Sequence, residues 1–216
     1  MAGGSRLIIA GCAGSLTDGV IEALEARNYT CEFVDLACET PSVIDAILSS
    51  GRVDGLVNLL APPSNLGVSQ TDFLSQCSRD WRRVLDIDVY GILDVTRAVL
   101  AHMCLHRSGS IVSVTSNVGL RGVPGLNAYS AAHAGIQMFT QSMAQDCAEH
   151  GVRINCIIAG EHEFPARDAA GNYREPPLGP GKYGPDVGAA AAFLLSGEAS
   201  HITGSCIDVS GGWSLS

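Results

Sequence analysis

Strand-like and helix-like segments alternate along this chain, and this alternation constrains its fold more than any other feature of the sequence. Short apolar runs are followed by longer stretches in which apolar residues recur at helical spacing. The first unit pairs a strand at residues 6–10 with a helix at residues 18–27, whose Val20, Ile21 and Leu24 share one face. Such alternation predicts right-handed crossovers and a mostly parallel sheet with helices on both faces.

The later units repeat this order. Further strands are expected at residues 30–34, 53–60, 110–115, 153–158 and 206–209. Further helices are expected at residues 41–50, 72–107 (in one or two pieces), 128–150 and 185–195. Since no linker, internal repeat or low-complexity tract interrupts the pattern, we expect a single doubly wound α/β domain over residues 1–216, which binds its ligands at the carboxyl ends of its strands.

The composition limits the partners of this chain. Nearly half of the residues (46%) are apolar and 25 are glycine, which suits close packing of helices on a buried sheet. The formal net charge of −9 repels phosphate backbones, so we expect no nucleic-acid partner. No apolar run reaches the roughly 18 residues that a membrane-spanning helix needs, and the first residues lack the pattern of a signal peptide. We therefore expect a cytoplasmic protein with no membrane partner.

The cysteines and histidines form no metal-ligating pattern. The eight cysteines are scattered without a C-x-x-C pair, which indicates free, mostly buried thiols and neither a zinc site nor a redox motif. His102 and His106 are four residues apart and share a helical face, but no third ligand accompanies them. We expect no metal site.

A glycine-containing turn follows the first strand, where residues 11–17 read G-C-A-G-S-L-T. Glycine in such a turn lets the backbone approach a phosphate, whose charge the helix N-terminus then favours. About 20 residues later, Asp35 ends the second strand, where its carboxylate can accept hydrogen bonds from a ribose diol and repel a 2′-phosphate. A plain strand–helix turn and a solvent-exposed acid are the alternative interpretations.

The most specific pattern lies in the second half of the chain. Residues 109–116 read G-S-I-V-S-V-T-S, and Ser116 precedes Tyr129 by 13 residues. Here the chain resembles the short-chain dehydrogenase/reductase family, which has a catalytic Ser and Tyr at this spacing. The glycine turn, the V-R-I-N-C-I-I-A-G of residues 152–160 and the terminal strand resemble other motifs of that family, so the resemblance covers the whole chain. It implies a Rossmann-like fold.

The resemblance also implies catalytic roles. In the family, the Tyr at the position of Tyr129 is the general acid/base and the Ser at the position of Ser116 polarises the substrate oxygen. His133 stands at the Lys position of the family's Y-x-x-x-K motif, and Asp88 stands where the family has an Asn within a preceding helix. Two of the four catalytic positions are therefore changed.

A dinucleotide site is implied at the glycine turn. Gly11 matches the first glycine of the family's T-G-x-x-x-G-x-G, whereas Ser15 and Thr17 replace the next two, with Leu16 between them. The side chain of Thr17 can either crowd a pyrophosphate or give it a hydroxyl group.

Three further residues complete the candidate cofactor-binding set. Asn58 is what remains of the family's N-N-A-G turn, and Gly160 ends the segment that resembles I-R-V-N-x-I-x-P-G. Asp35 favours NAD over NADP.

The two changed catalytic positions raise a specific hypothesis. A free tyrosine has a pKa near 10 and is a poor base at neutral pH unless a cation lies beside it. A carboxylate raises the pKa of a neighbouring imidazole. Asp88 is therefore expected to keep His133 cationic beside Tyr129. Drift of both positions after loss of activity is the alternative.

Three functions are compatible with these residues. The first is NAD(P)(H)-dependent oxidation or reduction of a small alcohol or carbonyl compound. The second is a non-redox enzyme on the same scaffold, such as a halohydrin dehalogenase-like protein, a lyase or a dehydratase. The third is a binding or scaffold protein without catalysis. The resemblance further implies a homodimer or homotetramer, assembled through the long helices at residues 72–107 and 128–150.

Overall fold

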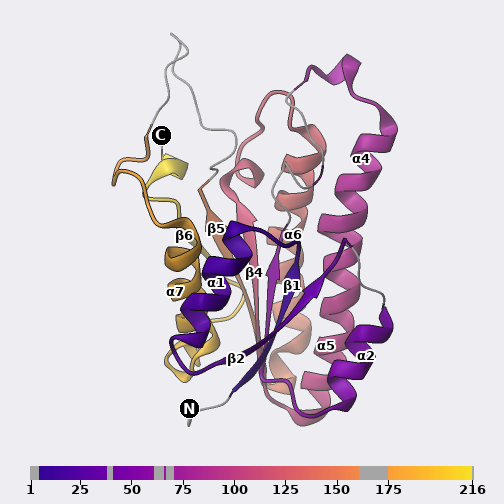
Figure 1. Ribbon diagram of the computed structural model, residues 1–216, viewed down its shortest axis with the longest axis vertical. Helices are drawn as coiled ribbons and strands as arrows, with labels where there is room; N and C mark the ends of the chain where they lie inside the picture. The colour runs from indigo at the N-terminus through magenta and orange to yellow at the C-terminus, as the bar shows by residue number, and fades with distance from the viewer. Residues whose placement is uncertain (1–4, 38–40, 61–65, 67–70, 161–174, 216) are drawn as a thin grey trace.

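The computed structural model describes residues 5–37, 41–60, 66, 71–160 and 175–215, and its strands form one six-stranded sheet (Figure 1). In chain order the strands are β1 (Arg6–Gly11), β2 (Thr30–Asp35), β3 (Gly55–Leu59), β4 (Gly109–Ser116), β5 (Val152–Ala159) and β6 (Cys206–Val209). They lie in the order β2-β1-β3-β4-β5-β6, and each neighbouring pair is parallel. The predicted doubly wound α/β fold is confirmed.

Helices connect the strands. The α-helices within the described ranges are α1 (Ser15–Glu25), α2 (Pro41–Ser49), α4 (Ser78–Leu85), α5 (Ile92–His106), α6 (Asn127–Cys147) and α7 (Tyr183–Leu195). A π-helical segment, η2 (Asp86–Gly91), joins α4 to α5. Single 3-10 turns are η1 (Phe73–Ser75), η3 (Asn117–Gly119), η4 (Ala148–His150), η5 (Gly197–Ala199) and η6 (Trp213–Leu215). Among the described residues, no helix is both long and apolar enough to cross a membrane.

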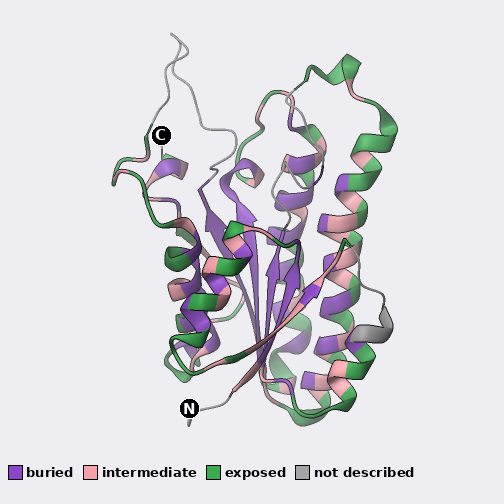
Figure 2. Cartoon of the chain, in the orientation of Figure 1, coloured by how far each residue is buried: buried purple, intermediate pink, exposed green. Residues whose placement is uncertain are grey.

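The sheet is buried on both faces, because helices cover each of them (Figures 1 and 2). Side chains alternate between the two faces along each strand. Ile9 of β1 therefore joins the core that α1 and α7 cover, whereas Ile8 joins the core that α2, α5 and α6 cover. The central strands are consequently near-continuous apolar runs, as expected for a parallel sheet with two covered faces.

Helices α1 and α7 approach each other closely through glycine. A Cβ atom at Gly188 of α7 would lie 2.5 Å from the Cβ atom of Ala23 and 3.2 Å from the Cα atom of Val20, both in α1. A Cβ atom at Gly19 would lie 2.9 Å from the Cα atom of Gly184. Gly19, Gly184 and Gly188 therefore allow α1 and α7 to pack at close distance.

The sequence-based boundaries differ most from the structure in two helical segments. The helix expected at residues 18–27 begins at Ser15 and ends at Glu25, so its first turn directly follows the glycine turn. The long helix expected at residues 72–107 consists of η1, α4, η2 and α5. The extra residue per turn in a π-helix interrupts the regular helical hydrogen bonding, and such segments are frequent at functional sites. Apolar periodicity alone does not predict this interruption.

We expect Gly188→Ala to destabilise the protein by about 1–3 kcal/mol, because the added methyl group has no room between α1 and α7. The matched control is Gly135→Ala in α6, where a Cβ atom would meet nothing within 4 Å. That change should stabilise by up to about 1 kcal/mol, since alanine favours the helix over glycine. Urea unfolding of both variants measures the difference. Equal stability of the two would contradict the close helix crossing.

Candidate functional site

The candidate site lies at the carboxyl edge of the sheet, where the parallel strands end together. Gly11 ends β1 and pairs with Asp35, the last residue of β2. It also pairs with Leu59, the last residue of β3. Ser116 ends β4 and pairs with Ala159 of β5. Residues that lie far apart in the sequence are thereby brought to one edge, as the fold class predicted.

The glycine turn requires glycine at its first position. A Cβ atom at Gly11 would lie only 2.5 Å from the carbonyl oxygen of Leu59, so no other residue fits without moving β3. Gly14 is the N-cap of α1, and a Cβ atom there would meet nothing within 4 Å. No side chain caps this helix. The amides of its first turn are therefore available to an anion.

Thr17 turns inward. Its hydroxyl donates a hydrogen bond to the carbonyl oxygen of Cys12 at 2.7 Å, and the residue is only 4% exposed. Thr17 therefore braces the turn, and its hydroxyl group does not point to solvent where a phosphate would lie. Ser15 is exposed and Leu16 is half-buried at the start of the same helix.

Asp35 lies beside the turn, as expected from the sequence. Its carboxylate accepts the N–H of Ala37 at 2.9 Å, and the N–H of Leu36 donates to the carbonyl oxygen of Gly11 at 2.8 Å. The residue remains partly exposed. Asp35 is therefore held at the sheet edge next to Gly11, where it can meet a ligand.

Asn58 lies below the site. Its side-chain amide donates to the hydroxyl groups of Thr96 at 2.9 Å and Ser113 at 3.2 Å, and only 1% of the residue is exposed. It therefore ties β3 to β4 and α5. The structure thus gives the Asn58 side chain a role inside the sheet, and its contact with a cofactor stays a prediction.

Ser116, Tyr129 and His133 come together where β4 meets α6. Tyr129 and His133 are one turn apart on α6, and their rings meet edge to face with centroids 4.2 Å apart. The backbone N–H of Ser116 donates to Nδ1 of His133 at 2.8 Å. The Ser116 hydroxyl accepts the N–H of Val118 at 3.2 Å and contacts the side-chain oxygen of Asn117 at 3.3 Å.

His133 is a neutral imidazole. Because Nδ1 accepts a hydrogen bond, the single proton of the ring is on Nε2. Burial lowers the pKa of His133 to about 3, since the charged form would lose its hydration. Nε2 is buried and has no hydrogen-bond partner among the described residues. The ring is thus uncharged, and its Nε2–H donor makes no hydrogen bond to the described residues.

The expected ion pair between Asp88 and His133 is not present in the described part of the chain. Asp88 is fully buried in the π-helical segment η2, which packs against α6. However, no salt bridge joins it to His133, and burial alone accounts for the lowered pKa of the imidazole. The expectation that His133 supplies the cation of the family's Lys is therefore corrected, because burial lowers the pKa of the imidazole far below neutral pH.

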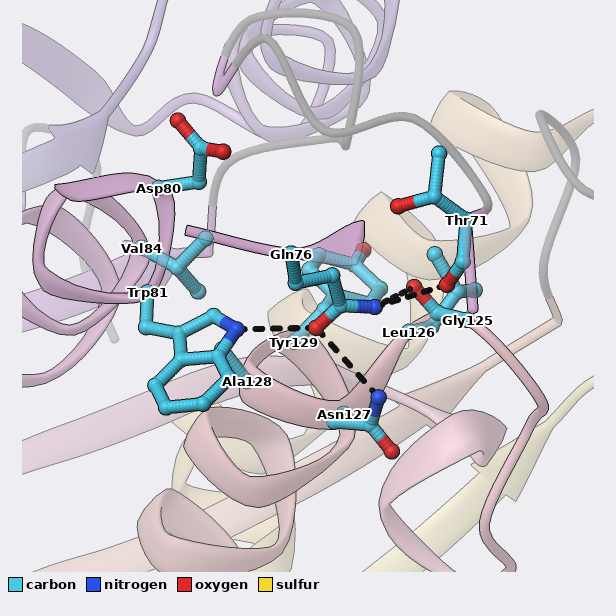
Figure 3. A pocket seen from close by; sticks show the side chains of 10 residues that line it. All are labelled: Thr71, Gln76, Asp80, Trp81, Val84, Gly125, Leu126, Asn127, Ala128 and Tyr129. Carbon is cyan, nitrogen blue, oxygen red and sulfur yellow. Dashed lines mark hydrogen bonds between the residues drawn. The ribbon is translucent and has the colours of Figure 1, made fainter. Parts of the chain in front are cut away.

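A small cavity beside Tyr129 was not predicted from the sequence. Its volume is about 40 Å³, and Gln76 holds its walls together (Figure 3). The amide of Gln76 donates to the carbonyl oxygens of Thr71 at 2.9 Å and Gly125 at 2.8 Å. Its oxygen accepts the indole N–H of Trp81 at 2.8 Å. Gln76 is a single polar residue in a loop, so no sequence signal distinguishes it.

A larger cavity, of about 530 Å³, lies at the ends of β5 and β6. Gly160, predicted to bind a cofactor, lines it together with Asp208, Ser210 and Tyr183. The sequence predicted a pocket here only through the family motif that ends at Gly160. Among the described residues, no cluster of three His, Cys, Asp or Glu side chains could hold a metal ion.

We predict that His133 makes stability depend on pH. Its pKa in the folded state, about 3, lies below the usual 6.5, so its contribution is complete above about pH 6.5 and is lost as the pH falls toward 3. Between pH 6 and pH 4 the unfolding free energy should fall by up to about 1.4 kcal/mol per pH unit from this residue. His133→Asn, whose oxygen can replace Nδ1, should flatten the slope in urea titrations.

The matched control for this prediction is His201→Asn, because His201 is exposed. It should leave the pH dependence of stability unchanged. An NMR titration in which the His133 ring gains a proton near pH 6.5 would contradict a neutral imidazole.

Comparisons with known sequences identify the family of this chain. Residues 22–214 match the family described as Enoyl-(Acyl carrier protein) reductase. The chain is 34% identical over 171 residues to the 3-oxoacyl-(acyl-carrier-protein) reductase FabG of Thermotoga maritima, covering 75% of this chain and 66% of that protein. It is 32% identical over 170 residues to nodulation protein G of Rhizobium meliloti, covering 76% of this chain and 67% of that protein. The first of these matches thus spans slightly less than two thirds of the relative's length.

Solved structures share the fold. The 3-ketoacyl-(acyl-carrier-protein) reductase of Brucella melitensis, complexed with NADH, superposes with a TM-score of 0.84 at 22% identity, over 98% of this chain and 99% of that one. ElxO with NADP bound superposes with a TM-score of 0.81 at 18% identity, over 98% of this chain and 99% of that one. At such identities the likeness establishes the fold alone.

Proposed function

Because the chain belongs to the short-chain dehydrogenase/reductase family, we propose that it is an NAD(H)-dependent oxidoreductase of a small alcohol or carbonyl compound. The proposal is supported by the contacts of His133, which accepts a hydrogen bond from the backbone N–H of Ser116 and packs against the ring of Tyr129. The relatives named as 3-oxoacyl-(acyl-carrier-protein) reductases suggest a 3-oxoacyl thioester as one substrate class.

The residues at the glycine turn fit a dinucleotide. Gly11 leaves no Cβ atom at the closest approach to Leu59, α1 has no side-chain cap, and Thr17 is turned inward and away from a phosphate. We propose that the first turn of α1, at Ser15 and Leu16, holds the pyrophosphate. Asp35 would hold the adenosine ribose, and its charge favours NAD over NADP.

In the proposed mechanism, each residue has a separate task. A dinucleotide held at the glycine turn would supply or accept the hydride. The Ser116 hydroxyl donates a hydrogen bond to the substrate oxygen, and the Tyr129 phenol gives a proton to that oxygen during carbonyl reduction. A free phenol keeps its proton at neutral pH, and His133 provides no positive charge that would change this.

Asp88 and His133 act as supports in this proposal. The unused N–H of His133 can donate to a ligand or a water molecule beside Tyr129, a role that needs no charge. We propose that Asp88, buried in η2 against α6, borders the same region. In the family that this chain resembles, the Asn and Lys at these two positions line one cavity.

A second candidate function follows from the neutral His133. A site without a cation at this position is less suited to holding a cofactor ribose, and the Asn58 amide is engaged by Thr96 in the sheet interior. A non-redox enzyme that retains Ser116 and Tyr129, such as a dehydratase, a lyase or a halohydrin dehalogenase-like protein, is the alternative. A scaffold protein without catalysis is the third.

We also propose self-association into a homodimer or homotetramer. Large apolar side chains are exposed on the helices that the family resemblance assigns to subunit contacts, namely Leu105 on α5 and Met138 and Phe139 on α6. Exposed apolar clusters on otherwise polar helices are typical of protein interfaces.

The decisive experiment measures NADH oxidation with a panel of small ketones and 3-oxoacyl thioesters. Tyr129→Phe should lower kcat/KM by about 10²–10⁴-fold, because it removes the proton donor. The control is Tyr90→Phe, since Tyr90 is 63% exposed, and it should leave the rate unchanged. NADH turnover that survives Tyr129→Phe would refute the proposed mechanism. Turnover that needs Tyr129 but no dinucleotide would establish the non-redox alternative. If the protein shows neither activity, the scaffold function is supported.

Asp35 should set the preference between the two dinucleotides. We expect the wild-type protein to bind NADH more tightly than NADPH. Asp35→Asn should lower the ratio of the Kd for NADPH to the Kd for NADH by about ten-fold or more, because the repulsion of the 2′-phosphate is removed. Fluorescence titration measures both constants. Asp45→Asn is the control, an exposed acid on α2. A ratio that does not respond to Asp35→Asn contradicts its assigned role.

A further inference from the structure

Cys156 of β5 and Cys206 of β6 are direct neighbours in the sheet, although 50 residues separate them in the sequence. They are Cα partners in the parallel register. Adjacent strands lie about 4.8 Å apart, which is within the range of Cα separations that disulfides span. Because the register aligns them, both side chains point to the same face of the sheet.

The two thiols are hydrogen-bonded to each other and differ in acidity. The hydrogen bond from Cys156 lowers the pKa of Cys206 to about 7, against a smaller opposing effect of burial. The same interaction, together with burial, raises the pKa of Cys156. The Cys156 sulfur also lies 3.3 Å from the Thr115 hydroxyl and 3.6 Å from the carbonyl oxygen of Ile157, to which it can donate. The thiolate that forms near neutral pH is therefore on Cys206, and Cys156 keeps its proton.

Accessibility also separates the two cysteines. Cys156 is 0% exposed, whereas Cys206 is partly exposed on β6, the outermost strand of the sheet. A small oxidant from solvent therefore meets the more acidic thiol first. The buried thiol lies next to it, where it can react with an oxidised sulfur.

A second thiol pair provides an internal contrast. Cys147, at the end of α6, is hydrogen-bonded to Cys104 of α5. Burial, followed by the interactions with Cys104, raises the pKa of Cys147 to about 11, and the residue is buried. Cys147 therefore stays protonated at neutral pH, and proximity to a second thiol does not by itself make it reactive.

We propose that Cys206 and Cys156 form a peroxide-sensitive dithiol that oxidises to a disulfide linking β5 to β6. The Cys206 thiolate attacks one oxygen of hydrogen peroxide, the O–O bond breaks, and the departing hydroxide takes a proton to become water. This step leaves a sulfenic acid on Cys206. The sulfur of Cys156 then attacks the Cys206 sulfur, the S–O bond breaks, and hydroxide leaves as a second water with the proton of Cys156. Two thiols are oxidised and one peroxide is reduced.

The disulfide should be easy to reduce. Side chains that stand in register on neighbouring parallel strands have Cβ atoms separated by close to the strand spacing, which exceeds the mean of about 3.8 Å in disulfides. A strained disulfide has a higher reduction potential and exchanges readily with thiols. The modification is therefore reversible by a small thiol.

The test treats the reduced, full-length protein with hydrogen peroxide near pH 7.5, blocks remaining thiols and maps the peptides by mass spectrometry. The expected product is an intramolecular Cys156–Cys206 disulfide that dithiothreitol reverses. A Cys104–Cys147 disulfide in its place, a link between two copies, irreversible sulfinic acid at Cys206, or an unmodified Cys206 would each overturn the proposal. This measurement needs no variant.

Three variants separate the roles of the two thiols. Cys206→Ser should abolish the disulfide, Cys156→Ser should leave a sulfenic acid on Cys206 that dimedone traps, and the control Cys104→Ser should change nothing. In the wild-type protein, an alkylating reagent at pH 7 should modify Cys206 at least about ten-fold faster than Cys147, because only the thiolate reacts. Equal rates for Cys206 and Cys147 would contradict the difference in acidity.

Discussion

The hydrogen bond from the backbone N–H of Ser116 to Nδ1 of His133, 2.8 Å long, determines much of the candidate site. It joins the end of β4 to the first turns of α6, and Gln137, one turn further along the helix, adds a second tie to the carbonyl oxygen of Ser116 at 3.3 Å. Tyr129 precedes His133 by one turn on the same face, so the position of the phenol follows from this attachment. The interaction also selects the tautomer of the imidazole, since an accepting Nδ1 leaves the proton on Nε2.

This bond gives the chemistry of the site a particular character. A lysine at the position of His133 would bring a charge that lowers the pKa of a neighbouring phenol. The neutral, buried imidazole brings an N–H donor in place of that charge, and its Nε2 has no partner among the described residues. A buried donor without a partner is costly, which is typical of atoms that serve a ligand or a bound water. Binding and orientation are thus the functions that His133 can supply.

The parallel sheet brings together residues that the chain keeps far apart. At its carboxyl edge, the shared ending of β1 and β2 sets Asp35 beside the glycine turn. Nearer the middle of β5, the register with β6 sets Cys156 beside Cys206. The first arrangement follows from a general rule for parallel α/β sheets, and the second depends on the register of one strand pair.

The sequence by itself determined the fold class and the succession of strands and helices along the chain, because apolar periodicity and glycine turns are local signals. It also placed Gly11, Asp35 and Ser116 at the ends of their strands, since strand ends can be recognised from the local pattern. Only the tertiary structure decided that His133 is neutral, because its pKa depends on burial by neighbours that are distant in sequence.

Dependence on distant neighbours also explains what the sequence did not show about Asn58 and the cysteines. The side chain of Asn58 is directed into the sheet interior, where Thr96 and Ser113 bind it. The scattered cysteines form no redox motif in the sequence, yet the β5–β6 register places Cys156 beside Cys206. Sequence spacing specifies contacts within a helix or a turn, whereas contacts between strands and the desolvation of a side chain exist only once the chain has packed.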